Sequence, residues 1–281
     1  MGEFEGVNPA NGVVIYYQLP KLADSIEVKM EIKDAAGKVV RTYSSKADEK
    51  YEGYPGGPPA NPTLMKGKGL NRHVWDMRYP IMMGAPKVYI ESSFRAHKAS
   101  PGAYSVTVKY GSTESNADFK ILPNPHYPTT PAQYEEYHTF MSEMESNLNT
   151  MHRQVATMLK ARNQLEAVIK DMGTQEKYAA LKKEAEALVK KMTAWDDDML
   201  QRKAKAYDDV DNYENKFTAN YMFLINQTES DIPRVNKPNR DRRAELEKDW
   251  AALEARSKAI METEVPAYTK KLWEAGIGAI Y

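Results

Sequence analysis

The first 124 residues alternate apolar and polar positions over short runs, which glycine, proline and asparagine interrupt. A period of two is typical of β-strands with one buried face. The pattern predicts six strands, at residues 13–19, 25–34, 38–45, 70–79, 103–111 and 117–122. Gly37 lies between the second and third runs and supplies the positive φ that a tight hairpin turn needs. Strands of this length and spacing predict a β-sandwich of the immunoglobulin or fibronectin III kind.

After the first 131 residues the apolar period changes to alternating steps of four and three, the heptad spacing of packed helices. In a first helix of about 42 residues, roughly 63 Å long, the spacing is broken only at Arg162. Its members are Tyr137, Met141, Met144, Leu148, Met151, Val155, Met158, Leu165, Ile169 and Met172. The spacing resumes after Gly173, where we expect the chain to reverse into an antiparallel second helix.

The rest of this half predicts two more helices. A shorter one covers residues 212–227. The last one should start near Arg240 with Asn239 as its N-cap. Pro266 lies inside it and should kink it, because proline removes a backbone donor. The helix should end at Gly276, which leaves a short apolar tail of Ile277, Ile280 and Tyr281.

Residues 123–131, PNPHYPTTP, separate the two patterns. Their four prolines exclude a helix and favour an extended connector. Thr130 is a favourable N-cap, and Pro131 suits the first helical position. We therefore predict an α+β chain in three parts. These are an immunoglobulin-like sandwich at 1–124, a proline-rich linker at 125–131, and an elongated three- to four-helix antiparallel bundle with heptad packing at 132–281.

Composition narrows the classes of partner. The chain has 39 basic and 39 acidic residues, so its net charge gives no reason to expect nucleic acid or an anionic membrane. No apolar run reaches the ~18 residues that a membrane helix needs. Cysteine is absent, which excludes disulfides and thiol catalysis and argues against a zinc site. The first residues, MGEFEGVNPANG, lack signal-peptide character, so we expect a cytosolic protein or a piece of a longer secreted one.

The stretch GLNRHVWDMRYP (69–80) contains several side chains that can take part in catalysis, and its pattern also predicts a strand. The two faces of that strand would be His73, Trp75, Met77 and Tyr79 on one side, and Arg72, Val74, Asp76 and Arg78 on the other. The first face suits a sandwich core around Trp75, and the second suits a charge ladder with Asp76 between two arginines. Catalysis also needs convergent partners that this pattern does not supply. We therefore predict a strand and no catalytic residue.

Other candidate sites also have plain structural interpretations. The five histidines form no HExxH motif and no i, i+4 pair. His138 and His152 share a helix face but lie about 21 Å apart, too far to hold one metal. Asp196, Asp197 and Asp198 lack the spacing of a calcium loop and are interpreted as a solvated helix end. We predict no metal and no cofactor.

Residues 46–69 form the one long irregular segment, which we predict to be a mobile surface loop. Tyr51 and Tyr54 stand in it among glycines and prolines, and their rings are suited to stacking on a sugar. They are the candidate ligand contacts of this chain.

Four stretches, NPANGVVIYYQL, IKDAAGKVVRTYSS, KGLNRHVWDMRYP and SPGAYSVTVKYG, resemble in order the module that follows the β-propeller in bacterial sortilin-like repeat proteins. Those proteins are often described as glycosyl hydrolases of the bacterial-neuraminidase-repeat type. The helical half is similar to the C-terminal tail of that family, down to EVPAYTKKLWEAGI. DAAGKVVRT and the tryptophan strand also resemble the immunoglobulin-like domain of flagellar hook-capping proteins. The sortilin-like resemblance implies a periplasmic or extracellular bacterial protein whose propeller and signal peptide belong to a longer parent chain.

These observations favour a non-catalytic accessory region that supports or docks the propeller of an exported protein. No catalytic residue of such a propeller has a matching position here. The alternative is a carbohydrate- or protein-binding module that uses the 46–69 loop or the exposed face of the sandwich. A third hypothesis, hydrolase activity in this chain itself, has no catalytic constellation to support it.

Overall fold

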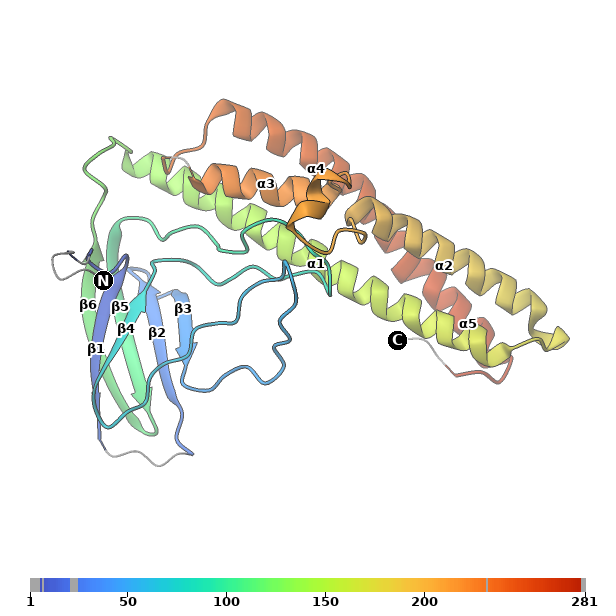
Figure 1. Cartoon of the computed structure of the whole chain (residues 1–281), viewed down its shortest axis with the longest axis horizontal. Coiled ribbons are helices and arrows are strands. Elements are labelled where there is room, and N and C mark those ends of the chain that lie inside the picture. The colour runs from blue at the N-terminus through green and yellow to red at the C-terminus, as the bar shows by residue number, and fades with distance from the viewer. Residues whose placement is uncertain (1–5, 7, 21–24, 231, 279–281) are drawn as a thin grey trace.

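The computed structural model describes residues 6, 8–20, 25–230 and 232–278 of the chain. The protein is α+β, with two small antiparallel sheets beside the first turns of a long helix (Figure 1). In the first sheet β1 (Val13–Leu19) pairs with β4 (Gly69–Trp75). The second sheet has the order β3-β2-β5-β6, formed by β2 (Val28–Asp34), β3 (Val39–Ser44), β5 (Gly102–Tyr110) and β6 (Thr113–Ile121).

The two sheets share one hydrophobic core, and Trp75 lies at its centre. Its indole is fully buried and meets the rings of Tyr104 and Phe119 edge-on, at centroid distances of 5.8 and 6.1 Å. Alternate side chains of β1 and β2 point into the same core, as the period of two predicts. Gly37 has a φ of 78° in the turn between β2 and β3, which confirms the predicted hairpin.

Strand β4 ends at Trp75, so the predicted strand over 70–79 is wrong in its second half. Met77 has a φ of 61°, which breaks the extended backbone, and the Trp75 indole donates to the Arg78 carbonyl at 3.0 Å. The predicted charge ladder is also wrong. Asp76 accepts only the Arg78 backbone N–H, at 3.1 Å, while the Arg78 guanidinium donates to the Ala96 carbonyl at 2.7 Å.

The helical half follows the heptad prediction closely. Helix α1 (Pro131–Met172) has the predicted 42 residues, and almost all of its predicted seam is buried. Thr130 caps it: its hydroxyl accepts from the Gln133 N–H, and the Gln133 side chain accepts from the Thr130 N–H at 2.9 Å. Gly173, with a φ of 55°, ends α1, and α2 (Ala179–Met199) returns along it (Figure 1).

The later helices differ from the prediction at their starts. Helix α3 (Phe217–Ser230) begins five residues after position 212, and a short 3₁₀ turn, Tyr207–Asp211, precedes it. Helix α4 (Lys237–Lys258) begins before Arg240. Its N-cap is Asn236, whose side chain accepts from the Asn239 N–H at 2.8 Å, so Asn239 is not the cap. The reason is Pro238, which is tolerated in the first turn, where no backbone donor is needed.

The interruption predicted at Pro266 is present. A π-helical stretch, Ala259–Glu264, separates α4 from α5 (Val265–Glu274). Gly276 has a φ of 75° and ends α5, and Ile277 packs against the helical core. The tail residues Ile280 and Tyr281 lie outside the described residues. None of the helices in the described part of the chain has the length and apolarity that crossing a membrane requires.

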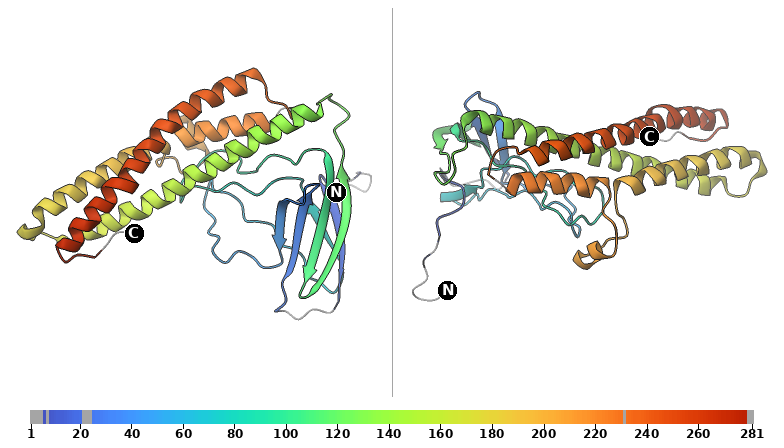
Figure 2. Two further views of the ribbon diagram at one scale, coloured as in Figure 1. Left: turned by 180° about the vertical axis from the view of Figure 1, so that it is seen from behind. Right: turned by 90° about the horizontal axis from the view of Figure 1, so that it is seen from above.

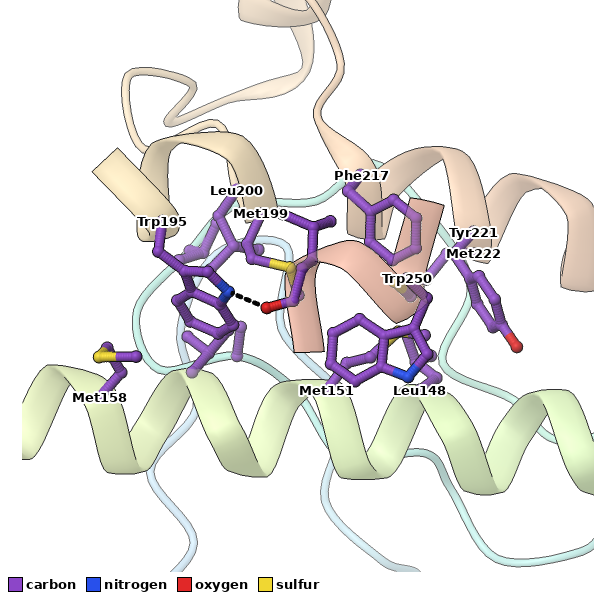
Figure 3. Close-up of a cluster of buried hydrophobic side chains, with 14 of the residues drawn as sticks. Leu148, Met151, Met158, Trp195, Met199, Leu200, Phe217, Tyr221, Met222 and Trp250 are labelled. Carbon is purple, nitrogen blue, oxygen red and sulfur yellow. Dashed lines mark hydrogen bonds between the residues drawn. The ribbon is translucent and has the colours of Figure 1, made fainter. Parts of the chain in front are cut away.

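The helices enclose a core of methionines and large aromatic rings (Figure 3). The Trp195 indole donates to the Leu253 carbonyl at 2.8 Å, and Trp250 stacks on Phe217 with centroids 6.0 Å apart. The predicted burial of the methionine seam is confirmed.

This core extends beyond the helices. The segment between β4 and β5 leaves the sheets, runs along α1 and returns (Figures 1 and 2). It buries five side chains in the helical core: Met82, Ala85, Val88, Ile90 and Phe94. We call residues 76–99 the bridging segment. Because of it, the helical core contains residues from the N-terminal side of the proline-rich linker.

Candidate functional site

A buried chain of hydrogen bonds joins the bridging segment to α1. Glu145 accepts from the His97 backbone N–H at 2.7 Å, and both of its carboxylate oxygens lie 3.0 Å from His97 Nδ1. His97 Nε2 lies 2.8 Å from His138 Nδ1. The His97 side chain is fully buried, and Glu145 is nearly so. Tyr79 stacks on both imidazoles, with centroid distances of 4.6 and 5.1 Å.

The distances define donors and acceptors along this series of hydrogen bonds. His97 Nδ1 donates its proton to Glu145. The contact between His97 Nε2 and His138 Nδ1 needs a proton on one of the two nitrogens and a lone pair on the other. Burial, followed by the proximity of His97 and Lys38, lowers the pKa of His138, in agreement with this arrangement.

The arrangement does not activate a nucleophile. The Ser142 hydroxyl lies 3.4 Å from His138 Nδ1, but the same nitrogen is already engaged by His97 at the shorter distance. A general base for Ser142 would need a free ring nitrogen at hydrogen-bond distance. Within the described residues, no group of three or more His, Asp or Glu side chains is placed to hold a metal ion.

His97 and His138 form a pair that no sequence motif predicted. His97 and His138 are 41 residues apart in sequence and meet only because the bridging segment packs on α1. His138 and His152 remain separate, as predicted. His152 also joins α1 to the bridging segment, further along the helix: its Nδ1 donates to the Met83 carbonyl at 2.5 Å. The imidazole is fully buried, and burial lowers its pKa to about 4.

A third contact joins the bridging segment to α3. The Arg78 guanidinium lies 2.9 Å from the Glu229 carboxylate, and both side chains are largely buried. Sequence reasoning missed Glu145, His97 and Glu229. The sequence offers one weak indication that Glu145 is buried: it directly follows Met144, at the edge of the apolar heptad positions of α1. No local pattern points to the other two residues.

A cleft of about 560 Å³ lies beside this contact. Its walls come from several parts of the chain: Asn11 before β1, the bridging segment with the turn before β5, the end of β6, the linker with the first turns of α1, and the end of α3 with the loop after it. Tyr127, Tyr134 and Tyr137 line it together with Met77, Lys98 and Glu229. The Tyr137 ring also meets His97 edge-on at 5.9 Å, so the cleft and the buried chain of hydrogen bonds adjoin.

The predicted ligand contacts lie elsewhere, in the 46–69 loop. The Tyr54 hydroxyl donates to the Ala85 carbonyl at 2.5 Å, and the ring packs closely against Gly57 and Gly84. The Tyr51 hydroxyl donates to the Pro58 carbonyl at 3.0 Å, and 40% of the residue is exposed. Their role in ligand binding stays a prediction. Tyr54 has a structural contact that ties the loop to the bridging segment.

The acidic run at the end of α2 is not simply solvated, so that prediction is wrong for Asp196. Its carboxylate is buried and accepts two hydrogen bonds from the Arg202 guanidinium, one of them at 2.6 Å. Arg162, the residue that interrupts the heptad seam, lies 3.8 Å away. Asp198 pairs with Arg256 of α4 at 2.6 Å. The chain after α2 folds back over the helix end, and the run of acids alone does not reveal this.

No protein-family model, no curated protein and no solved structure matches the chain.

Proposed function

We propose that the chain is a non-catalytic accessory region of an exported, sortilin-like bacterial protein, and that it supports or docks the β-propeller of that protein. In this proposal the two sheets form an immunoglobulin-like sandwich and the helices form an antiparallel bundle. The protein would act in the periplasm or outside the cell.

The observation that supports this proposal is the packing of the bridging segment on the helices. Polar side chains of α1 and α3 contact it at Arg78, Met83, Ser92 and His97, and its apolar side chains enter the helical core. A segment fixed at so many points cannot move independently of α1, since each fixed contact would have to break. A domain docked on the sheets would therefore keep one orientation relative to the helices, as a brace requires.

The outer face of the first sheet is a suitable docking surface. Val14 and Tyr16 lie on this face of β1, and Leu70 lies opposite Gln18 on the same face of β4. Tyr16 is 61% exposed and Leu70 is 72% exposed, which is unusual for adjacent large apolar side chains. The resemblance implies a propeller that precedes β1 in sequence, and β1 is one of the two strands that carry this face.

The test is calorimetric titration of this chain with the separately produced propeller of the same protein. We expect binding with a Kd of about a micromolar or tighter. The double variant Tyr16→Ser, Leu70→Ser should weaken it by about tenfold or more, because central apolar anchors dominate interface energies. Tyr51→Ser, which changes an exposed tyrosine away from this face, is the matched control. The proposal would be overturned if the gene that encodes this chain encodes no β-propeller. It would also be overturned if the propeller shows no detectable binding.

A second candidate function is a carbohydrate- or protein-binding module. The tyrosine-lined cleft favours it, because concave sites with aromatic walls and a few polar groups are typical of ligand binding. This function is compatible with the first, since the cleft and the β1–β4 face consist of different residues.

A further inference from the structure

The cleft has the size and position of a small-molecule site. Its volume of about 560 Å³ is within the range of roughly 300–1,000 Å³ that such sites occupy. It lies where the sheets, the linker and two helices meet, and sites at junctions between parts of a chain are common. The contacts at His97 and Arg78 hold these walls together before any ligand binds.

Three tyrosines line the cleft, and their rings are already in place for contact with a ligand. Tyr134 and Tyr137 are three residues apart on α1 and therefore share a helix face, and Tyr127 approaches from the linker. Burial raises the pKa of Tyr134 and of Tyr137, so both hydroxyls stay protonated at neutral pH. A tyrosine ring offers an apolar face and a polar edge to the same ligand.

The polar groups of the cleft favour a ligand without a net charge. Its lining is predominantly polar, which is unsuitable for a lipid or an apolar peptide. Among the described residues that line the cleft, two are charged, Lys98 and Glu229, and they have opposite signs. Glu229 is already paired with Arg78, and Lys98 is exposed to solvent, where its field is weak. The amides of Asn11 and Asn124 add both donors and acceptors.

Backbone strain in the cleft wall is a second, independent observation. Met77 lines the cleft with a φ of 61°, a left-handed conformation that is uncommon for a residue other than glycine. The Ala99 N–H donates to the Met77 carbonyl at 2.6 Å and holds it in place. Strained residues that surrounding structure fixes in this way are concentrated at ligand sites.

We infer that this cleft binds a short neutral saccharide, whose apolar ring faces stack on Tyr127 and Tyr134 and whose hydroxyls bond to Asn124 and Glu229. The inference rests on the second candidate function and moves its site from the 46–69 loop to the cleft. Mixed donors and acceptors, aromatic faces and the absence of a dominant charge together match a hydroxyl-rich ligand better than an ion, a lipid or an apolar peptide.

The test uses calorimetry and saturation-transfer NMR with four neutral probes: cellotriose, xylotriose, mannotriose and chitotriose. We expect at least one to bind. Tyr127→Ala should weaken binding by about tenfold or more, and Tyr127→Phe should retain most of it, because the ring makes the contact. Tyr51→Ala tests the 46–69 loop as the alternative site. Tyr207→Ala, at an exposed tyrosine that is in neither site, is the matched control and should change nothing. Circular dichroism of each variant shows whether the fold is intact.

The possible results distinguish saccharide binding in the cleft from the more general function of a carbohydrate-binding module. Binding that depends on Tyr51 and not on Tyr127 would keep the carbohydrate-binding module and overturn the cleft as its site. Affinity that falls steeply when salt rises from about 50 to 500 mM would overturn the neutral ligand, since only charged contacts are screened. Failure of all four probes to bind would overturn the inference and leave docking on the propeller as the function to test.

Discussion

Acid should weaken the attachment of the bridging segment to α1 through His152. The imidazole is fully buried, donates to the Met83 carbonyl and has a pKa of about 4. The unfolded chain has the ordinary value of about 6.5. Between these two values the unfolded state binds more protons, so folding loses stability as the pH falls. The contribution is fully present above pH ~6.5 and is lost by pH ~4.

The size of the stability loss follows from the difference between the folded and unfolded pKa of His152. A depression from 6.5 to about 4 corresponds to a loss of about 3 kcal/mol over that pH range. The variant His152→Asn removes the titration and places an amide donor near the position of Nδ1, so that the bond to Met83 can persist. The smaller side chain should cost about 1–3 kcal/mol at every pH. We therefore expect a variant that is less stable at neutral pH and less sensitive to acid.

The assay is urea unfolding at a series of pH values between about 7 and 4, followed by circular dichroism. The stability of wild type minus that of His152→Asn should start at about 1–3 kcal/mol near pH 7 and fall by about 3 kcal/mol across the series, to about zero or below. Other groups, including His138, titrate equally in both proteins and cancel. His126→Asn, which changes an exposed histidine of the linker, is the matched control. Parallel loss of stability in wild type and His152→Asn would refute the reasoning.

Three further predictions concern particular contacts. Glu145→Ala should destabilise the fold by about 3–5 kcal/mol in urea unfolding, because it leaves buried donors unpaired. Glu143→Ala, which breaks an exposed ion pair on the same helix, should cost about 1 kcal/mol or less, and equal losses would contradict this difference. Asp196→Ala should cost about 3 kcal/mol by the same measurement, and a loss near zero would show that its arginine pair is not buried in solution. Gly84→Ala should accelerate proteolysis of the 46–69 loop, because a Cβ would lie 2.3 Å from the Tyr54 hydroxyl; unchanged cleavage would show that this hydroxyl does not hold the loop.

Much of the secondary structure followed from local pattern. The period of two predicted β1 with its observed bounds, and the heptad spacing predicted the length and buried face of α1. The turns at Gly37 and Gly173 and the cap at Thr130 were also predictable, since each depends on a few neighbouring residues. In all of these, neighbours along the chain determine which side chains are buried together.

The candidate site depended on contacts between residues far apart in sequence. His97 meets Glu145 across 48 residues, and Met83 meets His152 across 69. No periodic pattern in the sequence predicts either contact. Both arise because β4 stops at Trp75 and the following chain packs on α1. The sequence by itself determined two regular halves and the faces that each would bury. Only the tertiary structure decided that an irregular segment joins them, because packing of irregular chain depends on the whole surface it meets rather than on its own pattern.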